Sequence, residues 1–188
     1  MKTFKALLLA GAFTFCISSQ AQTKNIEGID FPETISMNGQ ETVLNGGGLR
    51  TKLIFLDLYV GALYVKSKTS EAKKVIMADE EMGIRIEIAS KLVTQERFIE
   101  ALEEGFANAS AGKSNANDIK KFKDFLKDEF KKGDVISLNY HSGDAVYLSK
   151  NQKELGTFKG LAFKQALFSI WLGDVPAQES LKDEMLGS

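Results

Sequence analysis

Arg50 combines a charge suited to ligand binding with an unusual setting in the sequence. It lies just after three consecutive glycines (residues 46–48) and leads into an almost continuously apolar stretch at residues 53–65. Glycines allow close backbone approach, so a ligand group can lie against this segment. A guanidinium at the edge of an apolar chamber suits a carboxylate or an enolate-like oxygen, because its fork binds two oxygens at once. The alternative is a tight turn followed by an arginine that extends into solvent.

Two tyrosines lie within the same apolar stretch, at Tyr59 and Tyr64. Five residues apart on one strand, they point to opposite faces unless a bulge at Gly61 intervenes. Only one of them can therefore share a cavity with Arg50. A buried tyrosine must satisfy its hydroxyl, and a ligand oxygen is one candidate partner. For Tyr64, core packing with a hydrogen bond to the backbone is an equally good interpretation.

Other kinds of site are excluded by what the chain lacks. It has one cysteine and one histidine, too few for a zinc cluster, an iron–sulfur centre or a disulfide framework. His141 shares one predicted turn with Ser142 and Asp144, where the three cannot align as a catalytic triad. The glycine run has the spacing of neither a dinucleotide loop nor a phosphate loop. We therefore expect no metal and no cofactor.

The N-terminal 21 residues have the pattern of a secretory signal peptide. Lys2 and Lys5 precede an apolar core at residues 6–17, and small residues follow before Gln22. The apolar core is shorter than the ~20 residues that a spanning helix needs, so we expect cleavage after residue 21 and no stable membrane anchor. The prediction is a periplasmic or secreted protein.

The remaining residues, 22–188, are expected to form one domain. The whole chain has a formal net charge of −1, a near-neutral balance that does not favour binding to nucleic acid. No repeat or low-complexity linker divides the sequence. A domain of this size buries roughly 70% of the surface of its unfolded chain, enough for a core without disulfides.

Strands and helices follow one another in a simple order. Alternating or continuous apolar residues predict strands at 26–35, 42–44, 53–65 and 83–89, with a short helix at 71–77. Apolar residues at three- and four-residue spacing predict longer helices from Thr94 to about 109 and from Asn115 or Asn117 to a stop at Gly133. Strands at 135–140, 145–148 and 155–158, a helix at 161–172 and a short helix after Pro176 complete the chain. This layout indicates an α+β fold, with an antiparallel sheet covered by helices on one face.

Two segments of the chain, together with the predicted order of its elements, resemble the chalcone isomerase family. The residues that carry the resemblance are Gly-Gly-Gly-Leu-Arg at 46–50, followed by the aromatic-rich segment at 58–65. The predicted last helix, ending in Phe-Ser-Ile-Trp-Leu-Gly at 168–173 before Pro176, is similar to that family's C-terminal helix. The resemblance covers essentially everything after residue 21. It implies an open-faced β-sandwich, in which a large antiparallel sheet and a layer of helices enclose a ligand cleft.

The resemblance also implies roles for individual residues. In the plant enzymes an arginine assists closure of a flavanone ring, and related non-enzymatic members use the arginine and a strand tyrosine to hold a fatty-acid carboxylate. Arg50 matches the arginine of both groups, and Tyr59 matches the carboxylate-binding tyrosine. Phe98 falls where the enzymes have their catalytic tyrosine, and Gly105 falls near their asparagine. Ser169 is what remains of a polar pair in the last helix.

Our leading hypothesis is an exported, monomeric protein that binds a small apolar carboxylate such as a fatty acid without catalysis. The expected ligand-binding residues are Arg50, Tyr59, Phe98 and Ser169. The alternative is an intramolecular lyase or isomerase acting on a chalcone-like or other enone substrate, with Arg50 as its catalytic residue.

A third hypothesis is an interaction module whose cleft is filled by the chain's own aromatic side chains. Its hallmark would be Phe98, Phe106, Phe163 and Trp171 occupying the space behind Arg50.

Overall fold

The computed structural model describes residues 22–52 and 56–188. The predicted signal peptide and the first three residues of the apolar stretch at 53–65 lie outside the described residues. Within the described part of the chain, no helix is both long and apolar enough to cross a membrane.

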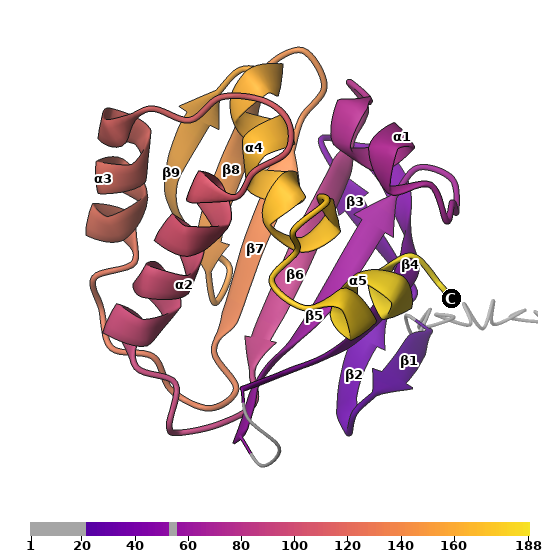
Figure 1. The fold of residues 1–188 in the computed structure, drawn as a ribbon. Helices are drawn as coiled ribbons and strands as arrows, with labels where there is room; N and C mark the ends of the chain where they lie inside the picture. The colour runs from indigo at the N-terminus through magenta and orange to yellow at the C-terminus, as the bar shows by residue number, and fades with distance from the viewer. Residues whose placement is uncertain (1–21, 53–55) are drawn as a thin grey trace, which may run out of the picture.

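Most strands of the described residues belong to one antiparallel sheet, with the strands in chain order from β3 to β9 (Figure 1). A separate two-stranded hairpin, β1–β2, precedes it. The hairpin strands are β1 (Thr23–Ile26) and β2 (Ile29–Pro32). The sheet strands are β3 (Thr34–Met37), β4 (Gln40–Lys52), β5 (Leu56–Val65), β6 (Met82–Ile88), β7 (Val135–Tyr140), β8 (Ala145–Lys150) and β9 (Lys153–Lys159).

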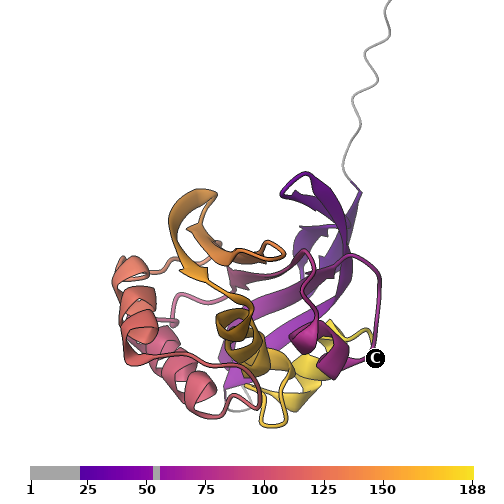
Figure 2. The same ribbon diagram turned by 90° about the horizontal axis from the view of Figure 1, so that it is seen from above.

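The helices of the described residues gather on one side of this sheet. Figure 2 shows the ends of the sheet curling toward the opposite side, with β8 and β9 at one end and the N-terminal strands at the other. The helices are α1 (Ala72–Met77), α2 (Gln95–Ala107), α3 (Ala116–Phe125), α4 (Leu161–Leu172) and α5 (Glu179–Met185). The predicted α+β fold, a large antiparallel sheet with a layer of helices on one face, is confirmed.

Each face of the sheet has its own apolar cluster. On the helix side, which we call the inner face, Tyr59, Leu63 and Val65 of β5 join the main core. On the other side, the outer face, Val60 and Tyr64 of the same strand form a smaller cluster that also includes residues of the β1–β2 hairpin. The two tyrosines therefore point to opposite faces, as their spacing predicts.

The glycine run lies inside a strand and not in a loop, which corrects our expectation of a short strand at 42–44 followed by a turn or ligand loop. Strand β4 is continuous from Gln40 to Lys52. A side chain on Gly46 or Gly48 would overlap Glu184 of α5, which lies against the inner face of β4. Gly46 and Gly48 are therefore required by the close approach of the C-terminal helix, whereas a side chain on Gly47 would overlap Gly61 of β5 and Ile26.

The predicted strand at residues 26–35 is also wrong in detail. Glu27 and Gly28 both have positive φ angles, 51° and 81°, the backbone of a tight hairpin turn. The Asn25 side chain accepts a hydrogen bond from the Gly28 N–H at 3.1 Å. This turn divides the segment into β1 and β2.

Helix α2 begins where its cap residue predicts, and α3 ends early. Thr94 accepts a hydrogen bond from the Arg97 backbone N–H at 3.3 Å, so it caps α2. Helix α3 ends at Phe125 and does not continue to Gly133 as predicted. The chain turns there because Phe130 is buried with its ring 5.1 Å from that of Phe98 in α2.

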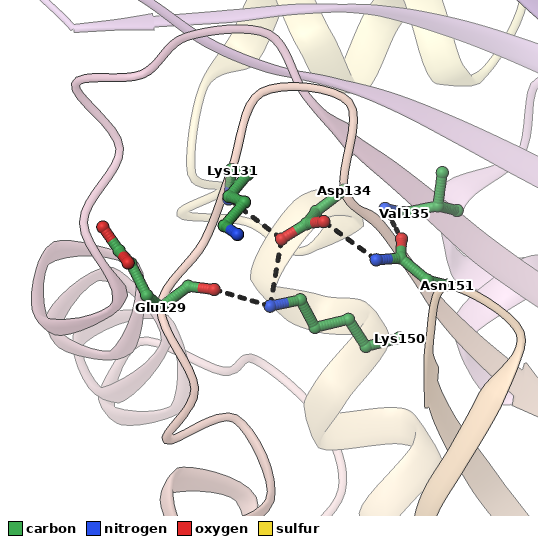
Figure 3. Close-up of polar contacts among 6 residues, drawn as sticks. All are labelled: Glu129, Lys131, Asp134, Val135, Lys150 and Asn151. Carbon is green, nitrogen blue, oxygen red and sulfur yellow. Dashed lines mark hydrogen bonds and ion pairs between the residues drawn. The ribbon is translucent and has the colours of Figure 1, made fainter.

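A polar cluster holds the segment after α3 against the end of β8 (Figure 3). Lys150 forms an ion pair with Asp134 at 3.0 Å and donates to the Glu129 carbonyl at 2.7 Å. Burial acts to raise the pKa of Asp134, but hydrogen bonds from Asn151, from the Lys131 backbone N–H and from Lys150 outweigh it and lower that pKa. The cluster thereby fixes the segment that carries Phe130.

Candidate functional site

A cavity of about 430 Å³ lies between strands β4 and β5 and helix α2. Its volume is in the range of sites for small organic ligands, roughly 300–1,000 Å³. Strand β5 contributes mainly apolar residues to its walls, β4 contributes two basic residues, and α2 contributes both charged and apolar residues. The lining residues are Arg50, Lys52, Leu56, Leu58, Tyr59, Val93, Arg97, Phe98, Glu100, Ala101 and Glu104.

Arg50 and Tyr59 face each other across the β4–β5 pairing. They are direct register partners, so their side chains share the inner face. Within the described residues, only Nη1 of the Arg50 guanidinium makes a hydrogen bond, which it donates to the Ala177 carbonyl. Nε is buried without a partner there. Leaving a buried donor unpaired costs about 1–3 kcal/mol, a cost that an acceptor bound beside Arg50 can reduce.

The Tyr59 hydroxyl accepts one hydrogen bond and, within the described residues, donates none. Its side chain is buried, and its hydroxyl oxygen accepts a hydrogen bond from Trp171 Nε1 at 2.9 Å. Burial raises the pKa of Tyr59, although the nearby Arg50 charge and the Trp171 hydrogen bond oppose that rise. The hydroxyl is therefore protonated at neutral pH. Within the described residues it donates to no protein acceptor, so its proton is available to a ligand oxygen.

Phe98 forms part of the cavity wall, as the family resemblance implies. Its ring lies edge-on to the Tyr59 ring with 6.1 Å between centroids, and edge-on to Phe130. It offers apolar surface and no hydroxyl. The structure thus brings three predicted site residues, Arg50, Tyr59 and Phe98, to one cavity.

Ser169 is not among the residues that line this cavity. It is buried in α4, and its hydroxyl donates to the Gln165 carbonyl one turn earlier at 2.7 Å. Such back-bonding is how a serine within a helix satisfies its hydroxyl locally. The structure therefore does not bring Ser169 to the other three residues.

Among the described residues, the aromatic side chains named in the third hypothesis do not fill the cavity. Phe106 and Phe163 pack against each other in the main core, with ring centroids 5.8 Å apart. Trp171 lies behind Tyr59, where it donates to the hydroxyl. Among residues 22–52 and 56–188, Phe98 lines the space beside Arg50 and the other three aromatic residues leave it open, which disagrees with the hallmark of a self-filled cleft.

The sequence reasoning missed most of the helical wall. Arg97, Glu100, Ala101 and Glu104 of α2 line the cavity together with Val93. Residues 97, 100/101 and 104 recur at three- and four-residue spacing, which places them on one helix face. That spacing could have indicated a shared wall once Phe98 was assigned to the site.

Two other residues that were considered for chemistry lie away from the cavity. Tyr64 donates to the Pro32 carbonyl at 2.8 Å on the outer face. The His141 ring packs on that of Tyr147, with centroids 4.2 Å apart. Within the described residues, no group of three or more histidine, cysteine or acidic side chains is placed to hold a metal ion.

A family comparison agrees with this fold. The sequence model of the chalcone isomerase-like family matches residues 23–187. The chain belongs to the chalcone isomerase-like family. A search of curated proteins found no match.

Among solved structures, this family member is similar to a fatty-acid binding protein of Arabidopsis thaliana, AtFAP1. The TM-score is 0.70 at 18% sequence identity, and the alignment covers 88% of this chain and 96% of that one. At this identity the likeness establishes a common fold. The open-faced chalcone isomerase-like sandwich is therefore the fold of this protein.

Proposed function

We propose that this chalcone isomerase-like protein binds a small apolar carboxylate, such as a fatty acid, in the cavity beside Arg50, and does not transform it. The observation that carries the proposal is a pair of side chains in the cavity lining that, within the described residues, keep donor hydrogens without an acceptor. These are the Arg50 guanidinium and the Tyr59 hydroxyl. The name of the structural neighbour, a fatty-acid binding protein, agrees with it.

A carboxylate matches these donors in number and charge. Its two oxygens accept from the guanidinium and from the tyrosine O–H, and charge-assisted bonds of this kind are about twice as strong as neutral ones. Leu56, Leu58 and Phe98 provide apolar surface for an alkyl chain. Each CH₂ group that the cavity buries adds about 0.8 kcal/mol, roughly a fourfold gain in affinity.

The three predicted site residues that line the cavity, Arg50, Tyr59 and Phe98, supply little acid–base chemistry. Burial raises the pKa of Tyr59, so its phenolate is scarce at neutral pH. Arginine does not deprotonate in proteins, and Phe98 stands where the family enzymes carry a catalytic tyrosine. This supports binding without turnover.

The second candidate function is an intramolecular lyase acting on a chalcone-like or other enone substrate. The buried, incompletely paired guanidinium of Arg50 favours it, because a preorganised charge in a dry site stabilises a developing oxyanion. Turnover of a chalcone panel that is lost in Arg50→Ala would establish this function.

We further propose that the protein is exported, as a monomer, to the periplasm or beyond. The support is the signal-like pattern of residues 1–21. N-terminal sequencing of the protein recovered outside the cytoplasm should begin at Gln22. Recovery of the full chain from the cytoplasm alone would overturn this.

The binding proposal is tested first by extracting the purified protein with organic solvent and identifying copurified lipids by mass spectrometry. Calorimetric titration with dodecanoate and with dodecan-1-ol then distinguishes the contribution of the carboxylate to affinity from that of the alkyl chain. Arg50→Ala is expected to weaken dodecanoate binding by about 30-fold or more, since a hydrogen bond to a charged group contributes about 1.5–3 kcal/mol. Dodecan-1-ol should bind both proteins with similar, weaker affinity.

The matched control is Arg85→Ala. Arg85 lies on the outer face, 5.7 Å from the centroid of the Phe31 ring, and like Arg50 has a buried Nε without a partner in the described residues. Its removal should leave dodecanoate affinity within about twofold, because distant sites act independently. Absence of any copurified lipid, together with unchanged affinity in Arg50→Ala, would overturn the proposal.

A further inference from the structure

Gln178 touches the strand that carries Arg50, although it lies 127 residues further along the chain than Thr51. It occupies the loop between α4 and α5 and is half-buried. Its side-chain oxygen accepts from the Thr51 backbone N–H at 2.9 Å. Its side-chain nitrogen donates to the Leu49 carbonyl at 3.1 Å. One amide group therefore bonds the backbone on both sides of Arg50.

This arrangement replaces a missing strand. Strand β3 pairs with β4 only as far as Val43, so β3 provides no ladder partner for residues 49 and 51. The Gln178 amide offers one donor and one acceptor, as a peptide group of a neighbouring strand does. On the other side of β4, the pairing with β5 is irregular between Arg50 and Thr51. The two hydrogen bonds of Gln178 therefore hold the β4 backbone at Arg50, at the point where its regular pairing with β5 is interrupted.

The residue before Gln178 holds the guanidinium itself. Arg50 Nη1 donates to the Ala177 carbonyl, and the Ala177 N–H donates to the Ile170 carbonyl of α4 at 2.7 Å. The loop is therefore anchored to α4 on one side and to Arg50 on the other. In Figure 1, α5, which follows this loop, lies beside β4 and β5.

Gln178 also occupies a position where a different residue type is usual. It is the N-cap residue of α5, where short polar side chains such as serine or aspartate normally accept from the first helical N–H groups. The Gln178 side chain makes no such cap bond. Its second amide hydrogen goes to Ser180 Oγ at 2.7 Å, which fixes the orientation of the amide. The side chain therefore bonds the backbone of β4 and one side chain of its own helix, but caps no backbone N–H of that helix.

We propose that Gln178 is a positioning residue for the ligand carboxylate, which acts by holding Arg50 and its strand in the geometry that presents the guanidinium to the cavity. The inference rests on the proposed binding of a carboxylate at Arg50. Gln178 itself is not among the residues that line the cavity. Its effect on the ligand therefore passes through Arg50.

The test is calorimetric titration of Gln178→Leu with dodecanoate and dodecan-1-ol, in wild-type and Arg50→Ala backgrounds. Leucine has a similar size but makes neither backbone bond. We expect dodecanoate affinity to fall about tenfold, equivalent to ~1.4 kcal/mol, while dodecan-1-ol affinity changes less than about twofold. In the Arg50→Ala background the substitution should have no further effect, because the residue through which it acts is gone.

Two further variants keep the test decisive. Gln40→Leu removes an exposed glutamine at the start of the same strand and should change neither affinity. Gln178→Glu keeps the acceptor for Thr51 but, when ionised, cannot donate to Leu49. At neutral pH this variant should bind dodecanoate more weakly than the wild-type protein does. When both proteins are compared at each lower pH, the difference in affinity should shrink, because protonation of the carboxylate restores the donor. It serves as the primary variant if Gln178→Leu does not unfold cooperatively.

The outcomes separate this inference from the proposed function. If wild-type protein does not bind dodecanoate, the proposed function fails and the inference fails with it. If wild-type protein binds normally and Gln178→Leu binds as tightly, only the role of Gln178 is overturned. Equal losses for the acid and the alcohol, or an undiminished loss in the Arg50→Ala background, would make Gln178 a general structural residue and likewise overturn the inference.

Discussion

Strand β5 carries two tyrosines on opposite faces of the sheet, and each has an arginine near it. On the inner face Tyr59 is the register partner of Arg50, and on the outer face the Arg85 charge acts on Tyr64. Burial raises the pKa of both tyrosines, that of Tyr64 to about 12. Both arginines have a buried Nε without a partner in the described residues. By residue type alone, the two pairs are equivalent.

They differ in what their polar atoms already contact. Tyr64 donates its only proton to the Pro32 carbonyl, and Arg85 lies near Glu87 at 4.0 Å and over the Phe31 ring. The Tyr59 hydroxyl instead accepts a hydrogen bond from Trp171 Nε1 and, within the described residues, donates none. A cavity adjoins Arg50 and Tyr59. The comparison teaches that a binding site here is defined by unused donors beside open space, and not by the presence of a tyrosine and an arginine.

The largest effect is expected from Gly46→Ala, which forces α5 away from the inner face. The new methyl group would overlap the Glu184 backbone carbonyl, which cannot rotate away as a side chain can. We expect a loss of about 3 kcal/mol in the free energy of unfolding, measured by urea titration, together with weaker dodecanoate binding.

The outer-face counterpart of that substitution is Ile26→Ala. Ile26 is buried in the smaller cluster, so its truncation should cost about 2 kcal/mol of stability by leaving a cavity. Dodecanoate affinity should not change. If both variants weaken binding equally, the two faces are not independent and the comparison fails.

Lys164 provides the next test of the comparison, because it is a buried basic residue whose donor hydrogens, unlike those of Arg50, all have protein carbonyls as acceptors. Its ammonium donates to the Val75, Ile76 and Ala78 carbonyls at the end of α1. Lys164→Met should cost about 2 kcal/mol of stability by leaving buried carbonyls unpaired, measured by urea titration at pH 7. Ligand affinity should stay unchanged.

The same variant has a predicted pH dependence. Burial lowers the pKa of Lys164 to about 7, although the Asp79 and Glu80 charges oppose this. Between about pH 7 and 10 the folded state loses this proton while the unfolded chain keeps it, so wild-type stability should rise relative to Lys164→Met. The slope is at most about 1.4 kcal/mol per pH unit. A constant difference over this range would show that the carbonyls keep the lysine charged.

A smaller effect is expected from removing single hydroxyl groups. Tyr59→Phe should weaken dodecanoate binding about tenfold, since a buried hydrogen bond to a charged acceptor is lost at a cost of ~1.4 kcal/mol. Tyr64→Phe should leave affinity unchanged and reduce stability by about 1 kcal/mol, because the Pro32 carbonyl loses its donor. Calorimetry and urea titration measure the two quantities. The reverse pattern would assign the ligand to the outer face.

The smallest effect is expected at the cavity rim. Lys52 and Arg97 are exposed cations in the cavity lining, so water and salt screen them. Lys52→Ser and Arg97→Ser should each weaken dodecanoate binding less than about threefold in ~0.01 M salt, and have no effect in ~1 M salt. A loss as large as that of Arg50→Ala would move the carboxylate to the rim.

The sequence predicted those parts of the fold whose signals are local. Strand β7 and helix α4 have the predicted bounds, because apolar period and terminal glycines determine them within a few residues. Strand β4 was misjudged, since glycine disfavours strands and the reason for Gly46 and Gly48 is the close approach of α5. That contact joins segments more than a hundred residues apart and leaves no periodic pattern.

As with the fold, the residues of the candidate site were predictable only where the signal is local or rests on the family resemblance. The pairing of Arg50 with Tyr59 rested on strand parity and on the family resemblance, and the register bears it out. Ser169 was misplaced because a serine hydroxyl in a helix can satisfy itself on the preceding turn. Ala177 and Gln178 were not anticipated, because a backbone carbonyl and a loop amide carry no signal until the fold brings them to β4.

The contact of Ala177 and Gln178 with β4 also has a consequence for biosynthesis. Synthesis proceeds from the N-terminus, at about 5–20 residues per second. The strand that carries Arg50 is therefore made early, while the loop that orients it is among the last segments to appear. A nascent or C-terminally truncated chain can pair β4 with β5, yet its arginine has no carbonyl to fix it. Under the binding proposal, we therefore expect the protein to capture a ligand only after residues 177 and 178 have been synthesised.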